Sequence, residues 1–170
     1  HIDLKGNCSI TSSDADPFKE GTGSVSFTGS NPQTITNANG ETFYNLAVNN
    51  TSAPGISLSS STDIAITNLL TLTDGIIDAR TNNCLVSLPD NASLSGGNAN
   101  SYIIGKMSKT GDDAFVFPVG DSTIWARIGI SAPDDITDAF EAEYFFAYPA
   151  YASITDESLN NVSSKEYWML

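Results

Sequence analysis

The chain has 170 residues and a formal net charge of −13, with only seven basic residues. A surface this acidic repels phosphate backbones, which argues against nucleic-acid binding. Apolar residues make up 40% of the chain and charged residues only 16%, so Ser, Thr and Asn supply much of the polarity of a folded protein. Because Thr suits strands and Asn, Ser and Gly suit turns, this composition predicts β structure.

Short apolar alternations dominate residues 1–105, and turn sequences such as Asn39-Gly40 and Asp74-Gly75 separate them. Helical periodicity is almost absent, and no apolar run reaches the length of about 18 residues that a membrane-spanning helix needs. In chain order, the expected strands are residues 2–4, 24–27, 33–36, 43–48, 56–58, 64–66, 70–73, 76–79, 85–88 and 92–94.

Equivalent apolar positions recur at a nearly constant spacing in this part of the chain. The expected equivalent pairs are Leu46 with Leu70, Leu70 with Ala92, and Ile66 with Val86. The members of each pair are separated by about 20–24 residues, and three short strands per coil at this period predict a β-solenoid over residues 1–105. A β-sandwich with short hairpins is the alternative, but these strands are very short for a sandwich and few of the connections resemble two-residue hairpins.

Residues 106–170 differ from the first part of the chain in strand length and aromatic content. Longer strands are expected at 114–120, 124–130 and 140–148, and the aromatic residues concentrate here. This pattern predicts a β-sandwich-like antiparallel portion with Trp125 in its core. The last four residues, 167–170, resemble the first half of a further strand, so this portion is expected to be incomplete at its C-terminus.

Seven sequence blocks, in this order, resemble a recurrent segment of very large surface proteins from Bacteroidota. They are Gly23–Gly29, Gln33–Thr36, Phe43–Asn50, Leu70–Gly75, Ser101–Lys106, Phe115–Asp121 and Ser163–Trp168. The resemblance implies an adhesin-like or structural segment, exported by type IX secretion to the cell surface. In that family the strand at the Tyr167-Trp168 block continues into further β structure, and here the chain ends there.

Acidic loops are candidate calcium sites, since Ca²⁺ takes oxygen ligands. The best candidate is the group of Asp134, Asp135 and Asp138; Asp112-Asp113 and Asp156-Glu157 are weaker ones. A solvated acidic loop is the alternative, because no group has the alternating order of a calcium-binding loop. No other cofactor is expected.

Two aromatic residues and one serine are candidates for glycan chemistry. Tyr148 and Tyr151 flank Pro149 in an expected loop and could bind a sugar ring by apolar contact. Ser122, in Asp121-Ser122-Thr123, matches the short sequence on which Bacteroidota attach O-glycans, although a tripeptide arises easily by chance.

Two cysteines, Cys8 and Cys84, are too few for a disulfide framework. If they lie about three coils apart, roughly 14 Å separates them along the solenoid axis. A disulfide requires Cα atoms within about 7 Å, so both are expected to be free thiols.

These observations predict a non-catalytic extracellular module of a large bacterial surface protein, structural or adhesive in function. A subunit of a self-assembling surface filament or layer, completed by strand sharing, is one alternative. A carbohydrate-binding module of a secreted glycanase is another. The expected partners are neighbouring domains of the same polypeptide, identical chains or glycans, and neither nucleic-acid binding nor membrane insertion is expected.

Overall fold

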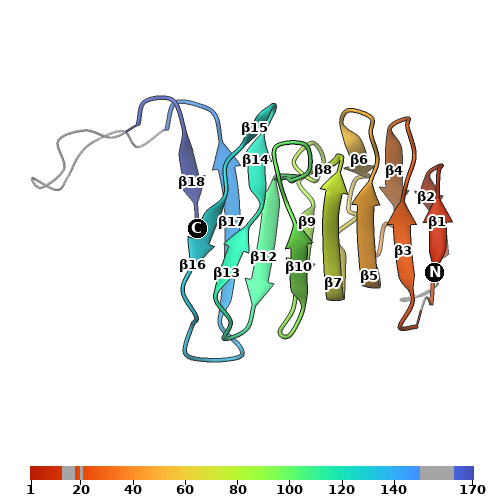
Figure 1. Ribbon diagram of the computed structural model, residues 1–170, viewed down its shortest axis with the longest axis horizontal. Coiled ribbons are helices and arrows are strands. Elements are labelled where there is room, and N and C mark those ends of the chain that lie inside the picture. The colour runs from red at the N-terminus through yellow and green to blue at the C-terminus, as the bar shows by residue number, and fades with distance from the viewer. Residues whose placement is uncertain (13–17, 20, 150–162) are drawn as a thin grey trace, which may run out of the picture.

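The chain winds into a parallel β-solenoid of about four turns, which antiparallel strands follow at its C-terminal end (Figure 1). The computed structural model describes residues 1–12, 18–19, 21–149 and 163–170. Within these ranges the chain is all-β, and no helix there is long and apolar enough to cross a membrane. The all-β class and the solenoid predicted from the sequence are confirmed.

The strands are short and follow the coils in order. Those of the solenoid are β1 Ile2–Leu4, β2 Cys8–Ser9, β3 Ser24–Phe27, β4 Gln33–Thr36, β5 Glu41–Asn49, β6 Gly55–Leu58, β7 Ile64–Asp74, β8 Ile76–Asp78, β9 Leu85–Leu88, β10 Ser93–Gly96, β11 Ile103–Ile104, β12 Lys106–Thr110, β13 Phe115–Phe117 and β14 Val119–Asp121. Those that follow are β15 Ile124–Trp125, β16 Ile128–Ile130, β17 Ala139–Phe145 and β18 Tyr167–Met169.

Each coil has three faces, and strands from successive coils stack in parallel on each face. Face 1 contains the first halves of β5 and β7, then β9 and β12. Face 2 contains β1, β3, the second halves of β5 and β7, and β10. Face 3 contains β2, β4, β6, β8, β11 and β14.

The coil period agrees with the expected spacing on most of these faces, but two of the expected equivalences shift by two positions. Leu46 pairs with Leu70 as expected. Leu70 then pairs with Leu94 rather than Ala92, and Val86 pairs with Ile64 rather than Ile66. A shift of two leaves each side chain on the same side of its strand, so an apolar pattern alone does not distinguish the two registers.

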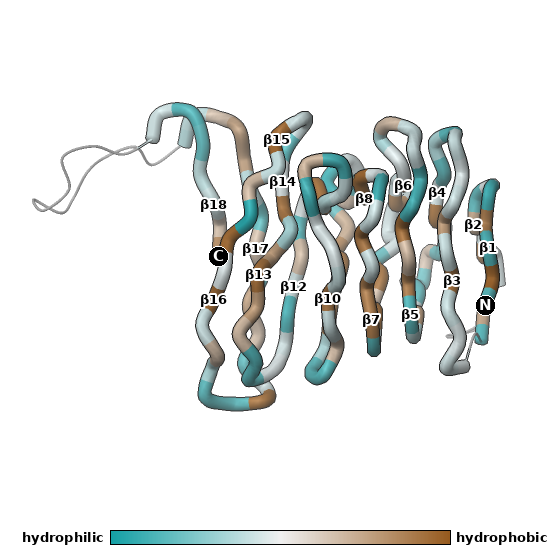
Figure 2. Tube along the Cα trace, viewed as in Figure 1, coloured by the Kyte–Doolittle hydropathy of each residue, from teal (hydrophilic) through white to brown (hydrophobic). Residues whose placement is uncertain are grey.

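Every second side chain of the coil strands points into the solenoid and packs on its equivalent in the next coil. Figure 2 shows the resulting alternation of hydrophobic and polar residues along the coils. These columns are at most 1% exposed: Val25, Leu46 and Leu70 on face 2; Ile56, Ile77, Ile103 and Val119 on face 3; Ile64, Val86 and Met107 on face 1.

Polar side chains on the outside also stack from coil to coil. The amide of Asn68 donates to Asn45 Oδ1 at 2.6 Å, and the hydroxyls of Thr36 and Ser59 lie 2.7 Å apart. These contacts explain the composition, because small polar side chains can form such ladders on a flat sheet without the repulsion that a column of like charges would cause.

The C-terminal portion is antiparallel, as predicted; β15, β17 and β18 extend the sheets of the solenoid, whereas β16 forms a separate two-stranded sheet with β13. β17 joins β12 and then β18, while β15 joins β14 and β16 joins β13. Parallel pairing continues as far as β14, so the change falls within 106–170 rather than at residue 105. The expected strand 114–120 is divided at Pro118, which has no N–H to donate, and β13 and β14 on either side of it belong to different sheets.

Arg80 connects the solenoid to the antiparallel portion. Its Nε donates to Glu143 Oε1 and its Nη1 lies beside Asp121 Oδ1, both at 2.8 Å. Its Nη2 donates to the carbonyl of Tyr144, and its guanidinium carbon lies 4.6 Å from the ring centroid of Phe145. Because Arg80 follows β8 and most of its partners lie on β17, these contacts hold together two chain segments that are far apart in sequence.

Candidate functional site

Face 2 is interrupted after β10, although its two neighbouring faces continue. On face 1 β9 pairs with β12, and on face 3 β11 pairs with β14. Among the described residues, β10 pairs only with β7 and β13 pairs only with β16. Two strand edges that have no partner among the described residues therefore flank an opening in the side of the solenoid.

This opening is a groove of about 690 Å³, called here the β10–β13 groove. Ser93 and Gly96 of β10 line one side, and Phe115 of β13 lies on the other. The walls approach each other beyond the end of β10, where a Cβ on Gly97 would lie only 3.0 Å from the Cβ of Pro118. The groove is therefore narrow at this end, and its wall on the β10 side is mostly backbone and small side chains.

Trp125 and Arg127 also line the groove, Trp125 as a second aromatic side chain in addition to Phe115 and Arg127 as an exposed cation. The Trp125 Nε1 atom is buried and has no hydrogen-bond partner among the described residues. The guanidinium carbon of Arg127 lies 5.5 Å from the Trp125 ring centroid. The sequence predicted Trp125 in the core, but its side chain is only half-buried. The reason is that β15 pairs only with β14 among the described residues, so no further coil covers it.

Lys109 is a buried cation in the same lining, only 3% exposed. Its Nζ donates to the carbonyls of Pro89 at 3.2 Å and Thr110 at 2.7 Å, and no described carboxylate forms an ion pair with it. An ammonium has three N–H donors, so one of them is left over. Sequence reasoning overlooked Lys109, although its place two residues after the buried Met107 puts both on the inward side of β12.

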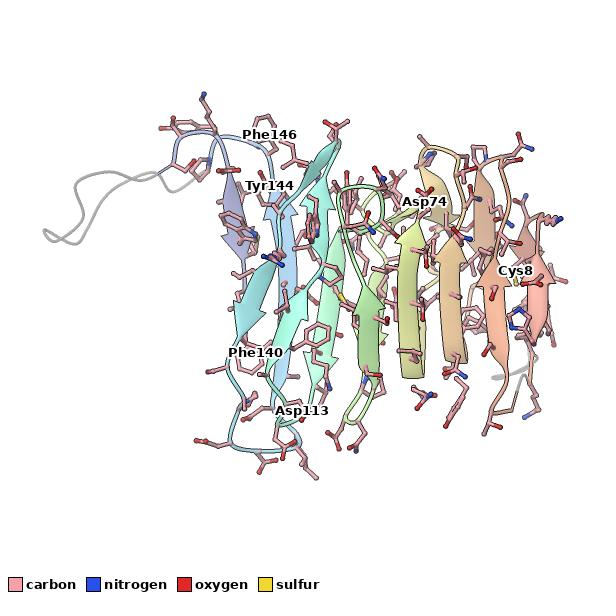
Figure 3. The ribbon with its side chains drawn as sticks, viewed as in Figure 1. Cys8, Asp74, Asp113, Phe140, Tyr144 and Phe146 are labelled. Atoms are coloured by element: carbon pink, nitrogen blue, oxygen red, sulfur yellow. The ribbon has the colours of Figure 1, made fainter. Side chains whose placement is uncertain are left out.

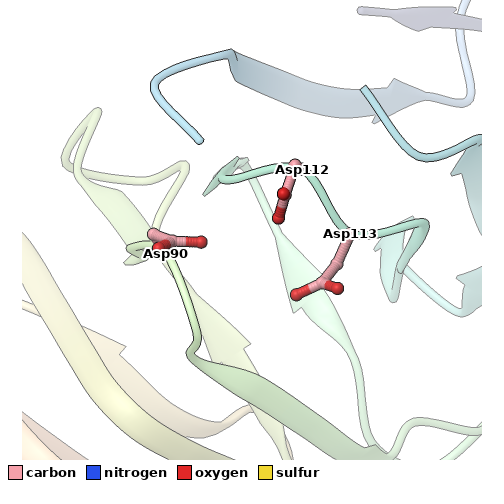
Figure 4. A group of neighbouring side chains, drawn as sticks. All are labelled: Asp90, Asp112 and Asp113. Atoms are coloured by element: carbon pink, nitrogen blue, oxygen red, sulfur yellow. The ribbon is translucent and has the colours of Figure 1, made fainter. Parts of the chain in front are cut away.

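Three carboxylates meet beside the part of the groove that Asp113 lines. Asp90, in the turn after β9, lies with Asp112 and Asp113, in the turn after β12, so that one oxygen from each is within 4.8 Å of the others (Figure 4). Such a group could hold a divalent cation. However, a Cβ on Gly111 would lie 2.6 Å from Asp90 Oδ1 and 3.2 Å from Lys109 Nζ, so the ammonium borders the same space and supplies a positive charge there.

The sequence singled out Asp112-Asp113 but not Asp90. A usable signal existed, because the separation between Asp90 and Asp112 in the sequence is one coil period. Residues one period apart lie side by side in a solenoid, so the period itself predicts their contact.

Asp134, Asp135 and Asp138, the predicted calcium ligands, do not come together in that way. Asp135 accepts hydrogen bonds from the backbone N–H and the hydroxyl of Thr137, at 2.8 and 2.7 Å, which lower the pKa of its carboxyl. Asp138 accepts the N–H of Asp135 at 3.3 Å. These carboxylates therefore stabilise their own turn, and the group that the structure brings together is Asp90, Asp112 and Asp113.

Of the predicted glycan residues, the structure describes Tyr148 and Ser122, which lie outside the β10–β13 groove. Tyr148 is 69% exposed and does not line the β10–β13 groove, and Tyr151 is outside the described residues. Ser122 is exposed at the tip of the turn between β14 and β15, where its carbonyl accepts a hydrogen bond from the Tyr102 hydroxyl at 2.6 Å. An exposed turn is accessible to a modifying enzyme, and the attachment of a glycan there stays a prediction.

Both cysteines are free thiols. Cys8 lies in the first coil at the N-terminal end, far from the antiparallel portion that carries Tyr144 (Figure 3), whereas Cys84 is buried just before β9. Burial raises the pKa of both thiols, and the nearby carboxylates Glu41 and Asp63 raise them further at Cys8 and Cys84 respectively. Little thiolate is therefore available for oxidation or metal binding.

No family model, no curated protein and no solved structure matches this chain. By its fold, the chain is a parallel β-solenoid with an antiparallel C-terminal portion, and its interrupted face carries the groove.

Proposed function

We propose that this chain is a non-catalytic structural and adhesive module, displayed on the outside of a bacterial cell as part of a large surface protein. The observation that carries the proposal is the solenoid itself. Its parallel sheets pair backbone with backbone from coil to coil around an unbroken apolar column. Such a rod resists bending, rises about 4.8 Å per coil, and presents flat polar faces along its length.

Three further features suit an exposed position. The net charge of −13 keeps such a rod soluble and apart from its neighbours. Its outer polar ladders use Asn, Ser and Thr, which remain hydrogen-bonded whatever the surrounding salt concentration. The burial of Cys84 and its raised pKa make this thiol a poor target for extracellular oxidants.

Strand sharing between copies is a second candidate function, favoured by the open ends of the rod. Among the described residues, β1 pairs only with β3 and β2 pairs only with β4 at one end, and β18 pairs only with β17 at the other. Trp168 and Met169 on β18 are 40% and 58% exposed. Unpaired edges with exposed apolar side chains are the features through which strands of neighbouring chains add to a sheet.

The test uses an antibody raised against the folded 170-residue chain. We expect it to label intact cells of the source organism, and to detect in their denatured extract a band far above 18.0 kDa. Labelling that needs cell lysis would refute the surface role. A denatured band near 18.0 kDa together with a native mass many times larger would instead support the strand-sharing assembly over the segment of a large surface protein.

A further inference from the structure

We infer that the β10–β13 groove binds an extended, acidic segment of another polypeptide, which adds as a strand to the open edge of β10. This inference goes beyond the structural role proposed above. It depends on the groove alone, so its success or failure does not depend on where the protein is located.

The first support is the interrupted face. A sheet edge without a partner presents N–H and C=O groups that an incoming strand can pair with, as in β-augmentation. Proteins usually protect such edges with Lys, Pro or a covering loop. The β10 sequence, Ser93-Leu94-Ser95-Gly96, contains neither Lys nor Pro, and Ser93, Ser95 and Gly96 are exposed. Of its two edges, only that toward β7 is occupied by a described strand.

The second support is charge. The chain as a whole carries −13, yet the groove lining contains two cations, Lys109 and Arg127, and one carboxylate, Asp113. Neither cation has an ion pair with a described carboxylate. The buried Lys109 also borders the Asp90, Asp112 and Asp113 carboxylates, so the charge complementarity comes from the exposed Arg127, which favours a ligand that places a carboxylate beside it.

The third support is the Trp125 Nε1 donor, which is buried and has no partner in the part of the chain that the structure describes. A buried donor without a partner is destabilising, and the carbonyl of a bound peptide would supply the missing acceptor. The same side chain argues against a sugar ligand. A sugar ring stacks on a face of the indole, and the Arg127 guanidinium occupies one of the two faces, 5.5 Å from the ring centroid.

The side chains next to the edge suggest the pattern of the ligand. Val116, on the facing strand β13, points outward and is 50% exposed. Val116 pairs with Gly129, and Arg127 lies two residues before Gly129, on the same outward side. Side chains of a strand alternate between the two faces of a sheet, so a ligand with alternating acidic and small apolar residues would place carboxylates outward, toward Arg127, and apolar groups inward, toward Phe115. β10 is four residues long, which sets the length of the paired segment at about four to six residues.

The probe is a labelled peptide, acetyl-Thr-Glu-Val-Glu-Val-Thr-amide, titrated with the full chain and followed by fluorescence polarisation. We expect saturable one-to-one binding that weakens as salt is added. Two further peptides carry N-methyl groups on alternate amides, in the two possible frames. Because only one set of amides in an added strand faces the sheet, one frame should lose at least about tenfold in affinity and the other should stay within about twofold.

Two variants test the protein side. Trp125→Phe keeps the ring but removes the donor, and Arg127→Gln removes the charge; each should weaken binding about fivefold, the effect of losing one hydrogen bond to the ligand. Lys5→Gln, an exposed basic residue at the other end of the rod, is the matched control and should bind like the parent chain. Circular dichroism confirms that all three fold.

Three outcomes would overturn the inference. They are no saturable binding of the peptide, an equal response to both N-methylation frames, and binding that Trp125→Phe and Arg127→Gln leave unchanged. Oligogalacturonate is titrated in parallel as an acidic glycan. If it binds with sensitivity to both variants while the peptide does not bind, the groove is a glycan site instead.

Discussion

Replacing Arg80 by Met should weaken the attachment of the antiparallel portion to the solenoid. The substitution keeps a side chain of similar length but removes the guanidinium that contacts Asp121 and Glu143, each at 2.8 Å. The Asp121 and Glu143 side chains are only 22% and 11% exposed, so without Arg80 two carboxylates would remain partly buried with no counter-charge from it.

The magnitude follows from this partial burial. Breaking a fully buried ion pair by removing one partner costs about 3–5 kcal/mol, whereas an exposed pair contributes about 0–1 kcal/mol. The Arg80 contacts lie between these limits and include a backbone carbonyl and the Phe145 ring, so we expect a loss of about 3 kcal/mol. In a chain of 170 residues this lowers the melting temperature by about 6–12 °C.

Urea unfolding followed by circular dichroism measures the change, and hydrogen exchange shows where it occurs. The amides of β17 should lose protection before those of β5 and β7, because β17 is held in part by Arg80. Arg127→Met is the matched control: Arg127 is exposed and its described contact is with the Trp125 ring, so its loss should change stability by less than about 0.5 kcal/mol. If Arg80→Met is as stable as this control, the carboxylates reach solvent by themselves and the argument from burial is wrong.

Three further predictions concern the core, the pH dependence and the thiols. Leu70→Ala should lower the free energy of unfolding in urea by about 3 kcal/mol, because it opens a cavity in the face 2 column. Thr42→Ala, at an exposed position, should lower it by less than about 0.5 kcal/mol. Equal losses would contradict the inward-facing position of Leu70. Tyr144 is fully buried, and burial, with help from the Glu166 carboxylate, raises the pKa of its phenol from 10.0 to about 12. The folded state therefore holds the Tyr144 proton more tightly, so the contribution of this proton to stability is complete below pH 10 and is lost as the pH rises to about 12. In Tyr144→Phe the urea midpoint should depend less on pH between 10 and 12. An unchanged pH dependence of the midpoint would contradict this assignment. Cys84 should react with a thiol reagent at pH 8 only after unfolding, and rapid labelling of the folded Cys8→Ser variant would show that the Cys84 site opens.

Much of the fold could be predicted from local patterns. The alternation of apolar and polar residues in a segment such as Leu70-Thr71-Leu72 predicts which side chains point inward. The turn residues between such segments limit the length of each strand. The spacing between Leu46 and Leu70 then indicates coils of one period, because equivalent residues must stack to fill a continuous core.

The limits of that reasoning appear at particular residues. Ala92 and Leu94 are both small enough and apolar enough to stack on Leu70, and only the observed pairing selects Leu94. Trp125 has apolar neighbours in sequence, which predicts a core position, but the side chain is half-buried because β15 is the last strand of its sheet. Burial at the end of a solenoid depends on what stacks above a strand, and a local pattern does not contain that information.

The candidate site was the least predictable part. Lys109, Trp125 and Arg127 meet in one groove because β13 pairs with β16 and not with β10, so that no described strand occupies the second edge of β10. Asp90 and Asp112, in contrast, were within reach of sequence reasoning, since they are separated by one coil period.

The all-β class, the coil period and the inward side of each strand could thus be predicted without coordinates, since they follow from residue chemistry repeated at short and regular spacing. The folded chain was needed to show where face 2 is interrupted, which side chains line the groove, and that Arg80 meets Glu143 on β17. These features depend on which strand edges remain free when the last coils turn antiparallel, and that choice is made by the packing of the whole chain rather than by any one segment.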